Sequence, residues 1–337
     1  MTRFAAIGLD HRHVYDMTAG LLAAGAVCAG HDPETTDPRV LAGFRKRFPD
    51  VPARSRDALL DDPSVDFIVL SAVPRDRSAI AAEAMRLGKD VMSDKPGVTT
   101  LAQLDAIRAA VRTTGRLWSI CAGRVASPAI QAAMQVVRSG ELGRLAHMTS
   151  LAPHRLNRAL RPAWFFDKPA YGGIINDIGV HSIDRFLALA GVAEAEIESS
   201  TIGAFGTAPE GFEDYAEMVL STGSVRGYCR VDWFTPDGLP DWGDGRLFLT
   251  GTEGTLELRK NLDIEGRAGS SHMFVANKTN TRYVDCSGLP VTYFRDFVSA
   301  VESRDFSLLP HEPVFTVCRM ALRAQAEAKR FVAAPRP

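Results

Sequence analysis

The sequence lacks the features that mark several large classes of protein. Lys and Arg (39) nearly balance Asp and Glu (40), so the net charge of −1 gives no electrostatic reason to expect binding to nucleic acid or to an anionic membrane. No apolar run approaches the length of about 18 residues that spans a membrane. The amino terminus leads directly into an apolar strand pattern, without the composition of a signal peptide. Internal repeats and low-complexity tracts are also absent.

Cysteine is scarce as well, with five residues scattered along the chain and no C-x-x-C pair. This spacing disfavours both a disulfide framework and a zinc site, and it indicates reduced thiols. With 46% hydrophobic and 23% charged residues, the 337-residue chain has the composition of a globular protein that is long enough for two domains. We therefore expect a soluble, cytoplasmic protein.

The first third of the chain alternates between short apolar strands and amphipathic helices. Strands are predicted at residues 4–7, 26–30, 66–70, 91–92 and 117–121. Helical connections of about 10 to 15 residues between such strands are typical of right-handed βαβ units and a parallel sheet. The pattern predicts a doubly wound, dinucleotide-binding Rossmann domain over residues 1–122.

The second half changes to the alternating pattern of half-buried strands. These strands are predicted at residues 197–202, 215–220, 224–231, 246–250 and 255–258. Glycine-containing turns separate them, which predicts an α+β domain with a large, mostly antiparallel sheet over residues 123–337. Two helices follow, at 293–302 and 314–331; we expect the first to pack on this sheet and the second to return to the first domain.

Residues 172–184 carry the strongest chemical signal in the sequence. Asn176 can cap a helix, and Asp177 and His181 then lie one turn apart on the same face. A carboxylate in that position can hold the tautomer of the imidazole and support its charged form, as in acid/base pairs. Asp184 lies three residues further along this face. Taken alone, the pair also fits an acidic first turn and a histidine packed in the core.

A second motif favours the catalytic interpretation over the core interpretation. Asp94, Lys95 and Pro96 follow the short strand at 90–93, and they place a lysine at the carboxyl end of a strand. Open α/β sheets bind their ligands at that edge. The triplet therefore joins the Asp177 and His181 pair as a second candidate for catalysis.

Together, the Asp-Lys-Pro triplet and the G-G-x-x-x-D-x-G-x-H-x-x-D pattern at 172–184 resemble the glucose-fructose oxidoreductase, inositol dehydrogenase and MocA-like (Gfo/Idh/MocA) family. The resemblance runs from Arg3 to about residue 332. It implies an NAD(P)-dependent dehydrogenase that acts on a secondary hydroxyl or ketone of a sugar, cyclitol or similar polyol. It also implies a homodimer or homotetramer that assembles through the C-terminal sheet.

The same resemblance assigns three catalytic roles. It implies that His181 takes the hydroxyl proton, that Asp177 orients and stabilises the imidazolium, and that Lys95 binds the developing alkoxide. The cofactor supplies the redox chemistry that no side chain provides. The bond between Lys95 and Pro96 is expected to be cis.

The loop after the first strand departs from the family pattern. Gly8 is present, but Asp10 and His13 replace the second and third glycines of G-x-G-x-x-G. We expect Asp10 either to face and repel the pyrophosphate or to turn away and cap the following helix. His11 or His13, once protonated, would offset the repulsion and strengthen binding at low pH. A sugar- or nucleotide-sensing relative that has lost normal cofactor binding remains the alternative reading.

Asp32 lies 24 residues after Gly8, at the end of the second predicted strand. A carboxylate there accepts hydrogen bonds from the ribose hydroxyls and repels a 2′-phosphate, so we expect NAD to be favoured over NADP. The expected cofactor-binding residues are Gly8, Asp10, His11, His13, Asp32, Pro74, Asp94, Lys95 and Pro96.

Residues 153–170 are rich in proline and arginine and show no periodicity. Long irregular loops are usually functional, so we expect this one to form a wall of the substrate pocket. The expected substrate-binding residues are Arg124, His154, Arg155, Asn157, Trp164 and Asp184. We expect no metal site. His11-x-His13 also fits a zinc-dependent amidohydrolase barrel, but the second half lacks the βα alternation that a barrel requires.

Overall fold

The computed structural model describes residues 1–121, 127–206 and 208–332. The chain forms two compact units that alternate along the sequence. Unit 1 comprises Met1–Ala122, Pro162–Gly172 and Thr292–Arg319; unit 2 comprises Gly123–Arg161, Gly173–Val291 and Met320–Pro337. The second domain expected over 123–337 therefore contributes two segments to unit 1.

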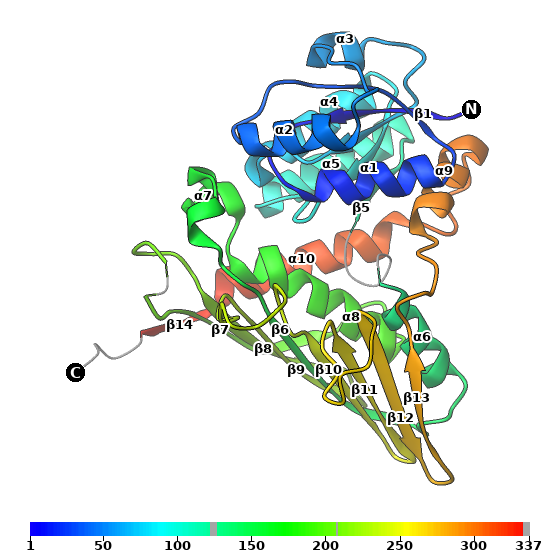
Figure 1. Cartoon of the computed structure of the whole chain (residues 1–337), viewed down its shortest axis with the longest axis vertical. Helices are drawn as coiled ribbons and strands as arrows, with labels where there is room; N and C mark the ends of the chain where they lie inside the picture. Colours follow the sequence, from blue (N-terminus) through cyan, green and yellow to red (C-terminus); the bar gives the residue numbers. More distant parts are fainter. Residues whose placement is uncertain (122–126, 207, 333–337) are drawn as a thin grey trace. The chain divides into compact units, whose positions relative to one another are not determined.

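Unit 1 is built on a five-stranded parallel sheet with the order β2-β1-β3-β4-β5 (Figure 1). Its strands are β1 (Arg3–Ile7), β2 (Val27–His31), β3 (Phe67–Leu70), β4 (Asp90–Ser93) and β5 (Trp118–Ile120). The helices between them are α1 (His13–Ala23), α2 (Pro38–Arg47), α3 (Arg56–Leu60), α4 (Pro74–Arg86) and α5 (Leu101–Thr114). The predicted Rossmann-like parallel sheet is confirmed. Its winding reverses beside β1, the position where such sheets bind ligands.

Local sequence explains where these elements begin. β3 is a continuous apolar run that is buried throughout, as expected for a parallel strand covered on both faces. Proline occupies the first turn of α2 and of α4, where its missing N–H costs nothing. The hydroxyl of Thr100 caps α5 by accepting from the backbone N–H of Gln103, and Gly115 ends that helix in the left-handed conformation.

Helix α9 (Tyr293–Ser303) packs within unit 1, which corrects the expectation that it covers the second sheet. The ring of Phe297 is fully buried, and its centroid lies 5.1 Å from that of Phe67 on β3. Phe294 lies so close to Gly20 of α1 that a Cβ there would approach its ring to 2.3 Å. An amphipathic pattern identifies the buried face of a helix but not the sheet that buries it.

Unit 2 is built on a nine-stranded sheet with the order β13-β12-β11-β10-β6-β9-β8-β7-β14. Neighbours are antiparallel except for β6 with β9 and β14 with β7, so the mostly antiparallel sheet is confirmed. Its strands are β6 (Leu145–Pro153), β7 (Glu196–Ala204), β8 (Tyr215–Ser221), β9 (Arg226–Asp232), β10 (Arg246–Gly251), β11 (Gly254–Lys260), β12 (Ser271–Asn277), β13 (Thr281–Asp285) and β14 (Lys329–Val332).

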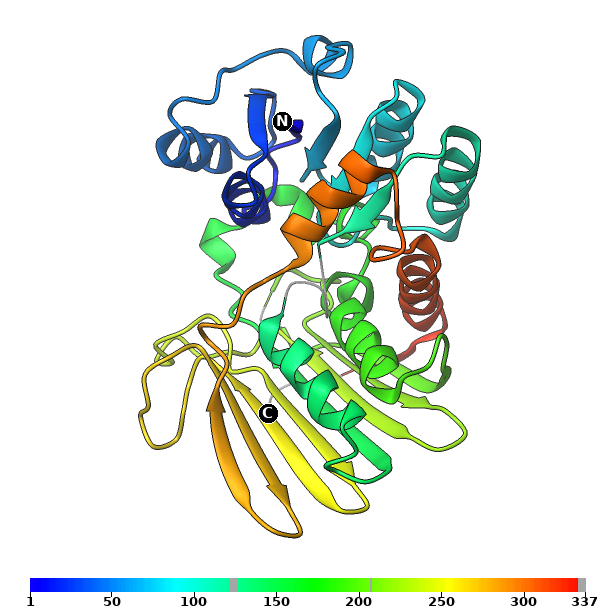
Figure 2. The ribbon, with the colours of Figure 1, turned by 90° about the vertical axis from the view of Figure 1, so that its right-hand side faces the viewer.

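Helices cover one face of this sheet. α6 (Pro128–Arg138) packs against β12, and α8 (Val180–Ala190) packs against β6 and α6 (Figure 2). A π-helical turn, η3 (Ile175–Gly179), runs directly into α8. The segment expected to be irregular, residues 153–170, contains short helices: η1 (Arg158–Leu160), η2 (Ala163–Phe166) and the start of α7 (Lys168–Tyr171).

The end of the chain corrects a second expectation. The last helix, α10, spans His311–Glu327, and the residues expected to extend it form the edge strand β14 instead. β14 is four residues long and pairs in parallel with β7, so only its partner in space marks it as a strand. β6, β12 and β13 also escaped prediction, because polar residues interrupt their alternation.

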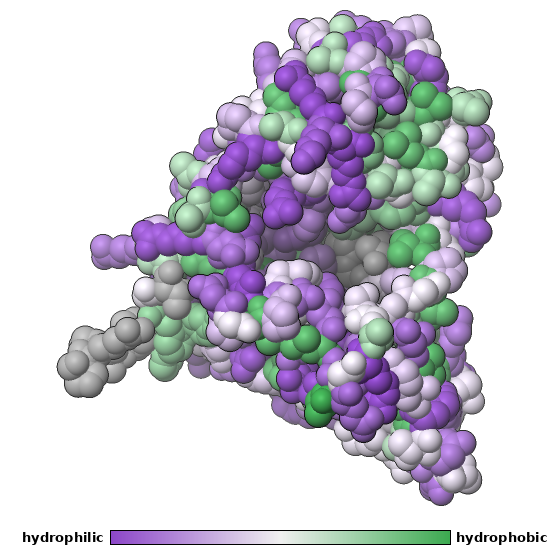
Figure 3. All heavy atoms as spheres, viewed as in Figure 1, coloured by the Kyte–Doolittle hydropathy of each residue, from purple (hydrophilic) through white to green (hydrophobic). Residues whose placement is uncertain are grey.

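Hydrophilic side chains are spread over the visible face of each unit, with small hydrophobic patches between them (Figure 3). None of the helices in residues 1–121, 127–206 and 208–332 combines the length and the apolar character needed to cross a membrane.

We predict that Phe297→Ala lowers the free energy of unfolding by about 3 to 5 kcal/mol, because it opens a cavity against β3. Urea denaturation followed by circular dichroism measures the change. Leu308→Ala removes a side chain that is 68% exposed and serves as the control, with an expected change within about 0.5 kcal/mol. Equal midpoints for both variants would show that α9 does not contribute to the core of unit 1.

Candidate active site

The loop from β1 to α1 turns sharply at Gly8, whose φ is +66°. A Cβ at this position would lie 2.4 Å from the Cβ of Ala72 and 2.6 Å from its Cα. The loop then passes over the end of β3, where the N–H of Asp10 donates to the carbonyl of Ser71 at 3.2 Å. Glycine is therefore required at the first position of the loop for steric reasons.

Asp10 is buried, and its carboxylate is turned toward the segment that follows β2. Oδ1 accepts hydrogen bonds from the N–H of Thr36 at 2.5 Å and from the hydroxyls of Thr36 at 2.7 Å and Thr35 at 3.0 Å. Oδ2 accepts from the N–H of Val73 at 3.3 Å. Helix α1 has no side-chain cap, so the expected capping role of Asp10 is wrong. Its side chain instead joins the segments that follow β1, β2 and β3.

His11 and His13 converge on a single carboxylate, that of Asp94 at the end of β4. Nδ1 of His11 lies 2.8 Å from Oδ2, and Nδ1 of His13 lies 2.7 Å from Oδ1. The two imidazoles meet edge to face with their centroids 4.2 Å apart. The first loop and the Asp-Lys-Pro motif, which sequence analysis treated separately, therefore form one cluster.

Asp94 is fully buried, and further groups donate hydrogen bonds to its carboxylate. Oδ2 also accepts from the guanidinium of Arg77 at 3.1 Å and from the hydroxyl of Ser71 at 3.1 Å, and Oδ1 accepts from the N–H of Lys95 at 2.7 Å. Burial opposes ionisation, but the neighbouring His13, Arg77 and His11 hold the pKa of Asp94 well below its usual value. Asp94 is therefore ionised, and protein groups occupy both of its oxygens.

The side chains of His11, His13 and Asp94 are of the types that bind metal ions, and their potential ligand atoms lie within 4.8 Å of one another. The buried guanidinium of Arg77 against the same carboxylate opposes a further cation there. The separations of 2.8 and 2.7 Å are also those of direct hydrogen bonds. We therefore interpret the cluster as a carboxylate that positions two imidazoles.

Burial first, and then the neighbouring His13, lower the pKa of His11 to about 4, against an ordinary value of 6.5. His11 is therefore neutral at pH 6. The expectation that protonation of this residue strengthens cofactor binding at pH 6 is not supported.

The start of α1 offers a second kind of group for an anion. In the part of the chain that the structure describes, no acceptor binds the backbone N–H groups of His11, Arg12 and His13. Unsatisfied N–H groups and the helix dipole make such a terminus attractive to phosphate. They lie in the loop that Gly8 shapes.

The remaining cofactor residues expected from the sequence lie at the carboxyl ends of the strands of unit 1. Asp32 follows β2, is buried and accepts from the N–H of Glu34 at 3.0 Å; burial is the main cause that raises its pKa. Pro74 opens α4 after β3. Lys95 and Pro96 follow β4 and are joined by a cis peptide bond, as expected.

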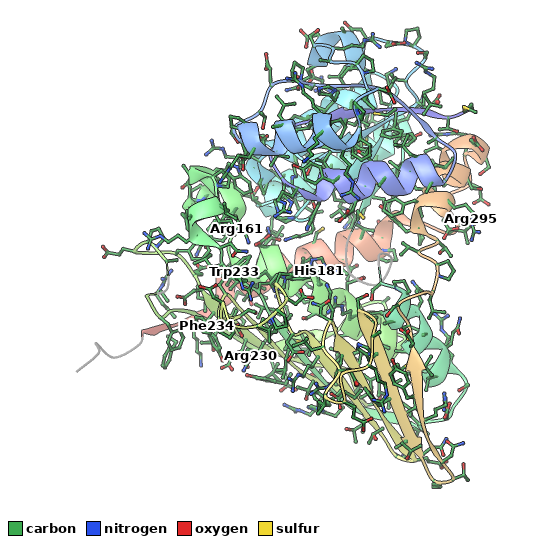
Figure 4. The ribbon with its side chains drawn as sticks, viewed as in Figure 1. Arg161, His181, Arg230, Trp233, Phe234 and Arg295 are labelled. Atoms are coloured by element: carbon green, nitrogen blue, oxygen red, sulfur yellow. The ribbon has the colours of Figure 1, made fainter. Side chains whose placement is uncertain are left out.

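Asp177 and His181 lie in unit 2, at the junction of η3 and α8. Asp177 is buried within the π-helical turn, and His181 is partly exposed near the start of α8 (Figure 4). Asn176 is buried inside η3 and the helix begins earlier, so Asn176 is not its cap. A π-helical turn of this kind is frequent at functional sites.

Two residues without a signal in the sequence hold this helix start. Oε2 of Glu213 accepts from the N–H of Ile174 at 3.1 Å, and Oε1 of Gln325 accepts from the N–H of Ile175 at 2.9 Å. Nε2 of Gln325 donates to Glu213 at 3.0 Å, so the two polar side chains also satisfy each other. Gly173, with φ +90°, leaves the space that Gln325 fills. Only the glycine pair at 172–173 signalled this arrangement in the sequence.

Among the expected substrate residues, His154 lies in an aromatic cluster of unit 2. Its ring centroid lies 5.4 Å from that of Trp233 and 4.7 Å from that of Trp242. The guanidinium of Arg161 lies over Trp233, 5.1 Å from the ring centroid (Figure 4). Asp184 lies on α8, one turn after Val180, and is partly exposed.

The other expected substrate residues lie elsewhere. Arg155 donates to backbone carbonyls of residues 236–239, with the bond to Pro236 at 2.9 Å, and so fixes a loop. Asn157 is exposed in the left-handed conformation before η1. Trp164 belongs to unit 1, where its ring centroid lies 6.5 Å from that of His11. Arg124 lies outside the described residues.

Comparison with known proteins gives matches to both halves of the chain. Residues 32–121 match the oxidoreductase family with an NAD-binding Rossmann fold, and residues 130–257 match the GFO/IDH/MocA C-terminal domain. A crystal structure from Erwinia carotovora atroseptica SCRI1043, assigned to the oxidoreductases, is 37% identical with a TM-score of 0.92. The match covers 98% of this chain and 99% of that one.

Curated relatives are more distant. The 1,5-anhydro-D-fructose reductase of Ensifer adhaerens is 28% identical, over 74% of this chain and 73% of its own. Two uncharacterised oxidoreductases of Schizosaccharomyces pombe are 27% and 24% identical, and the chain spans only 44% and 58% of their lengths. Among structures that share the fold at 15% and 20% identity, a 3-ketoreductase from Actinomadura kijaniata holds NADP and a protein of gentamicin A biosynthesis holds NAD.

We predict that the stability of the protein falls as the pH drops from 6.5 toward 4, in part because of His11. Between these values the unfolded chain binds a proton at His11 that the folded chain does not, so the free energy of unfolding decreases as pH falls. Urea midpoints of the wild type and of His11→Asn, measured from pH 7 to pH 4.5, give the two pH slopes. The variant should show the shallower slope. Parallel slopes would mean that His11 titrates normally in the folded protein.

Proposed function

The chain belongs to the Gfo/Idh/MocA oxidoreductase family, and from this premise we propose that it is a dehydrogenase that transfers a hydride between a nicotinamide cofactor, NAD in preference to NADP, and a secondary hydroxyl or ketone of a sugar, cyclitol or similar polyol. The observation that carries the proposal is that Lys95 follows β4 while Asp177 and His181 lie at the junction of η3 and α8. A binding module would need none of these three residues in its chemistry.

The residues of unit 1 fit a dinucleotide. Gly8 allows the close turn, and the backbone N–H groups at the start of α1 suit a pyrophosphate. Asp10 accepts hydrogen bonds from Thr35, Thr36 and Val73, so the protein itself stabilises its charge. Asp32 at the end of β2 suits the ribose hydroxyls. When bound, the nicotinamide supplies the site that gives or takes the hydride.

We assign the proton transfer to unit 2. In the oxidation direction, the imidazole of His181 accepts the proton of the substrate hydroxyl, and in reduction it returns the proton to the same oxygen. The buried carboxylate of Asp177 orients the imidazole and stabilises its charged form. The ammonium of Lys95 donates a hydrogen bond to the substrate oxygen while negative charge develops there.

The rival proposal is a sensor that binds a sugar or nucleotide without turnover, and the unusual loop with His11 and His13 favours it. Calorimetry with NAD separates the two. If no NAD binds at millimolar concentration, the dehydrogenase proposal should be abandoned for the sensor.

We predict that His181→Asn and Lys95→Met each lower kcat about a hundredfold or more, because each removes a proton or charge partner of the transition state. A screen of polyols and their keto forms, followed by NADH absorbance, first identifies a substrate. For His181→Asn, the NAD affinity should stay within about twofold of the wild type and the free energy of unfolding within about 0.5 kcal/mol. His147→Asn, a partly exposed histidine on β6, is the matched control and should keep full turnover. Comparable turnover in His181→Asn would remove this residue from the mechanism.

We predict that NAD is used better than NADP and that Asp32→Ser reduces the ratio of the two kcat/KM values by about tenfold or more, because the carboxylate repels a 2′-phosphate. Glu34→Ser changes a neighbouring acid of the same segment and is the control. A wild-type preference for NADP would contradict the role given to Asp32.

We also propose that the helix-free face of the nine-stranded sheet forms a homodimer, which two copies extend to a tetramer. On this face, the hydroxyls of Tyr215 and Tyr228 both donate to Oε2 of Glu217, at 2.9 and 2.8 Å, so these three polar side chains are already paired. Phe205 and Phe234 are exposed beside Tyr215. Light scattering at micromolar concentration should give a dimer or tetramer, and Phe234→Lys should shift it toward the monomer. A monomeric wild type would contradict this assembly.

A further inference from the structure

The helix-covered face of the sheet in unit 2 carries two cations at one end. Lys260 ends β11, and its N–H donates to the carbonyl of Gly245, on the same face as the buried Leu258 and Leu256 two and four residues earlier. Arg185 lies on α8, one turn after His181. Ser182 of α8 lies 3.1 Å from Ser150 of β6, hydroxyl to hydroxyl, which fixes the helix on this face.

Neither cation has an anionic partner among the described residues. In the part of the chain that the structure describes, no carboxylate lies within 4.0 Å of the guanidinium of Arg185 or the ammonium of Lys260. Nε of Arg185 is buried without a hydrogen-bond acceptor. Asp184 and Asp241 act on them only at longer range, the first on Arg185 and the second on Lys260.

The two cations also destabilise each other. Burial, and then the charge of Arg185, lower the pKa of Lys260 to about 8. Burial likewise lowers the pKa of Arg185. Lys260 is exposed and Arg185 is partly exposed, but Nε of Arg185 is buried. A buried donor without an acceptor is costly, and a neighbouring charge of the same sign adds to that cost. A bound anion would remove that cost.

Aromatic rings border Lys260. The ammonium of Lys260 lies over Trp242, 4.1 Å from the ring centroid, and this cation–π contact fixes the side chain without cancelling its charge. The ring of Trp242 packs on His154, which packs in turn on Trp233. The exposed part of Trp242 offers an apolar face of the kind on which sugar rings stack.

We propose that Arg185 and Lys260 bind the anionic group, a carboxylate or a phosphate, of an acidic carbohydrate substrate. The inference rests on the proposed function, because it gives His181 the hydroxyl of the same molecule. His181 and Arg185 lie four residues apart in the regular helix α8, so their Cβ atoms are about 6 Å apart on one face. This spacing matches a hexose that carries an anionic group at one end and the reacting hydroxyl at the other.

Calorimetry on the full chain, without cofactor and with saturating NAD, tests the proposal. The probes are D-glucuronate and D-gluconate for a carboxylate, D-glucose 6-phosphate for a phosphate, and D-glucose and myo-inositol as neutral counterparts. We expect at least one anionic probe to bind about tenfold or more tightly than its neutral counterpart, with an affinity that falls as salt is added. The class that binds tighter identifies the anionic group.

Lys260→Met should raise the Kd of that probe about tenfold or more and leave the Kd of neutral sugars within twofold. Arg185→Gln should act in the same direction; circular dichroism and urea midpoints establish that it folds. Lys278→Met is the matched control: this exposed lysine pairs with Glu253 on the same sheet, and its removal should change neither Kd. Equal affinity for anionic and neutral probes, absence of binding by either, or an unchanged Kd in Lys260→Met would overturn the proposal.

These binding measurements include no hydride transfer, so their outcome is separate from that of the proposed function. Tight binding of an acidic sugar without turnover would support the site and refute the dehydrogenase. Oxidation of neutral polyols with no advantage for acidic ones would support the dehydrogenase and refute the anion site.

Discussion

A carboxylate that has lost all contact with water needs donors on every side, and Asp94 is the buried charge around which unit 1 is arranged. Arg77 of α4, Ser71 after β3 and the two imidazoles of the first loop all reach it. Arg77 is itself buried and also donates to the carbonyls of Ala72 and Pro96. The ends of β1, β3 and β4 are thus tied together through one charge, and this links the loop between β1 and α1 to the Asp-Lys-Pro motif.

This arrangement explains how a loop without two of its usual glycines can still be ordered. Glycine-rich loops approach phosphate through bare backbone, and here His13 and Asp10 add side chains at those positions. Each side chain is directed to a protein partner: His13 to Asp94, and Asp10 to the threonines after β2. The backbone N–H groups at the start of α1 stay unsatisfied by described residues. The departure from the family pattern therefore changes the side-chain network more than the backbone that would meet a phosphate.

Much of the architecture could be predicted because it depends on local periodicity. β4 was expected at 90–93 and lies there, since an apolar run between a helix and Asp-Lys-Pro has few alternatives. What could not be predicted depends on partners far apart in the sequence. Gln325 and Glu213 hold the start of η3 from positions 150 and 39 residues away, and neither shows a local signal. Asp10 illustrates the same limit, because its orientation is decided by Thr36 and Val73 and not by its neighbours in the loop.

The two units treat their charged side chains in opposite ways. In unit 1 the carboxylate of Asp94 meets a guanidinium, two imidazoles, a hydroxyl and a backbone N–H, so its hydrogen-bonding capacity is filled by the protein. In unit 2 Arg185 and Lys260 repel each other, and among the described residues only the ring of Trp242 and acids at longer range act on their charges. Asp94 thus has its partners within the protein, whereas Arg185 and Lys260 repel each other. Either an anion from outside the chain binds these two cations, or their repulsion only lowers the stability of unit 2. His181 lies one helical turn from Arg185. A bound anion would therefore give the two cations a role in substrate recognition, whereas lowered stability alone would give them no role.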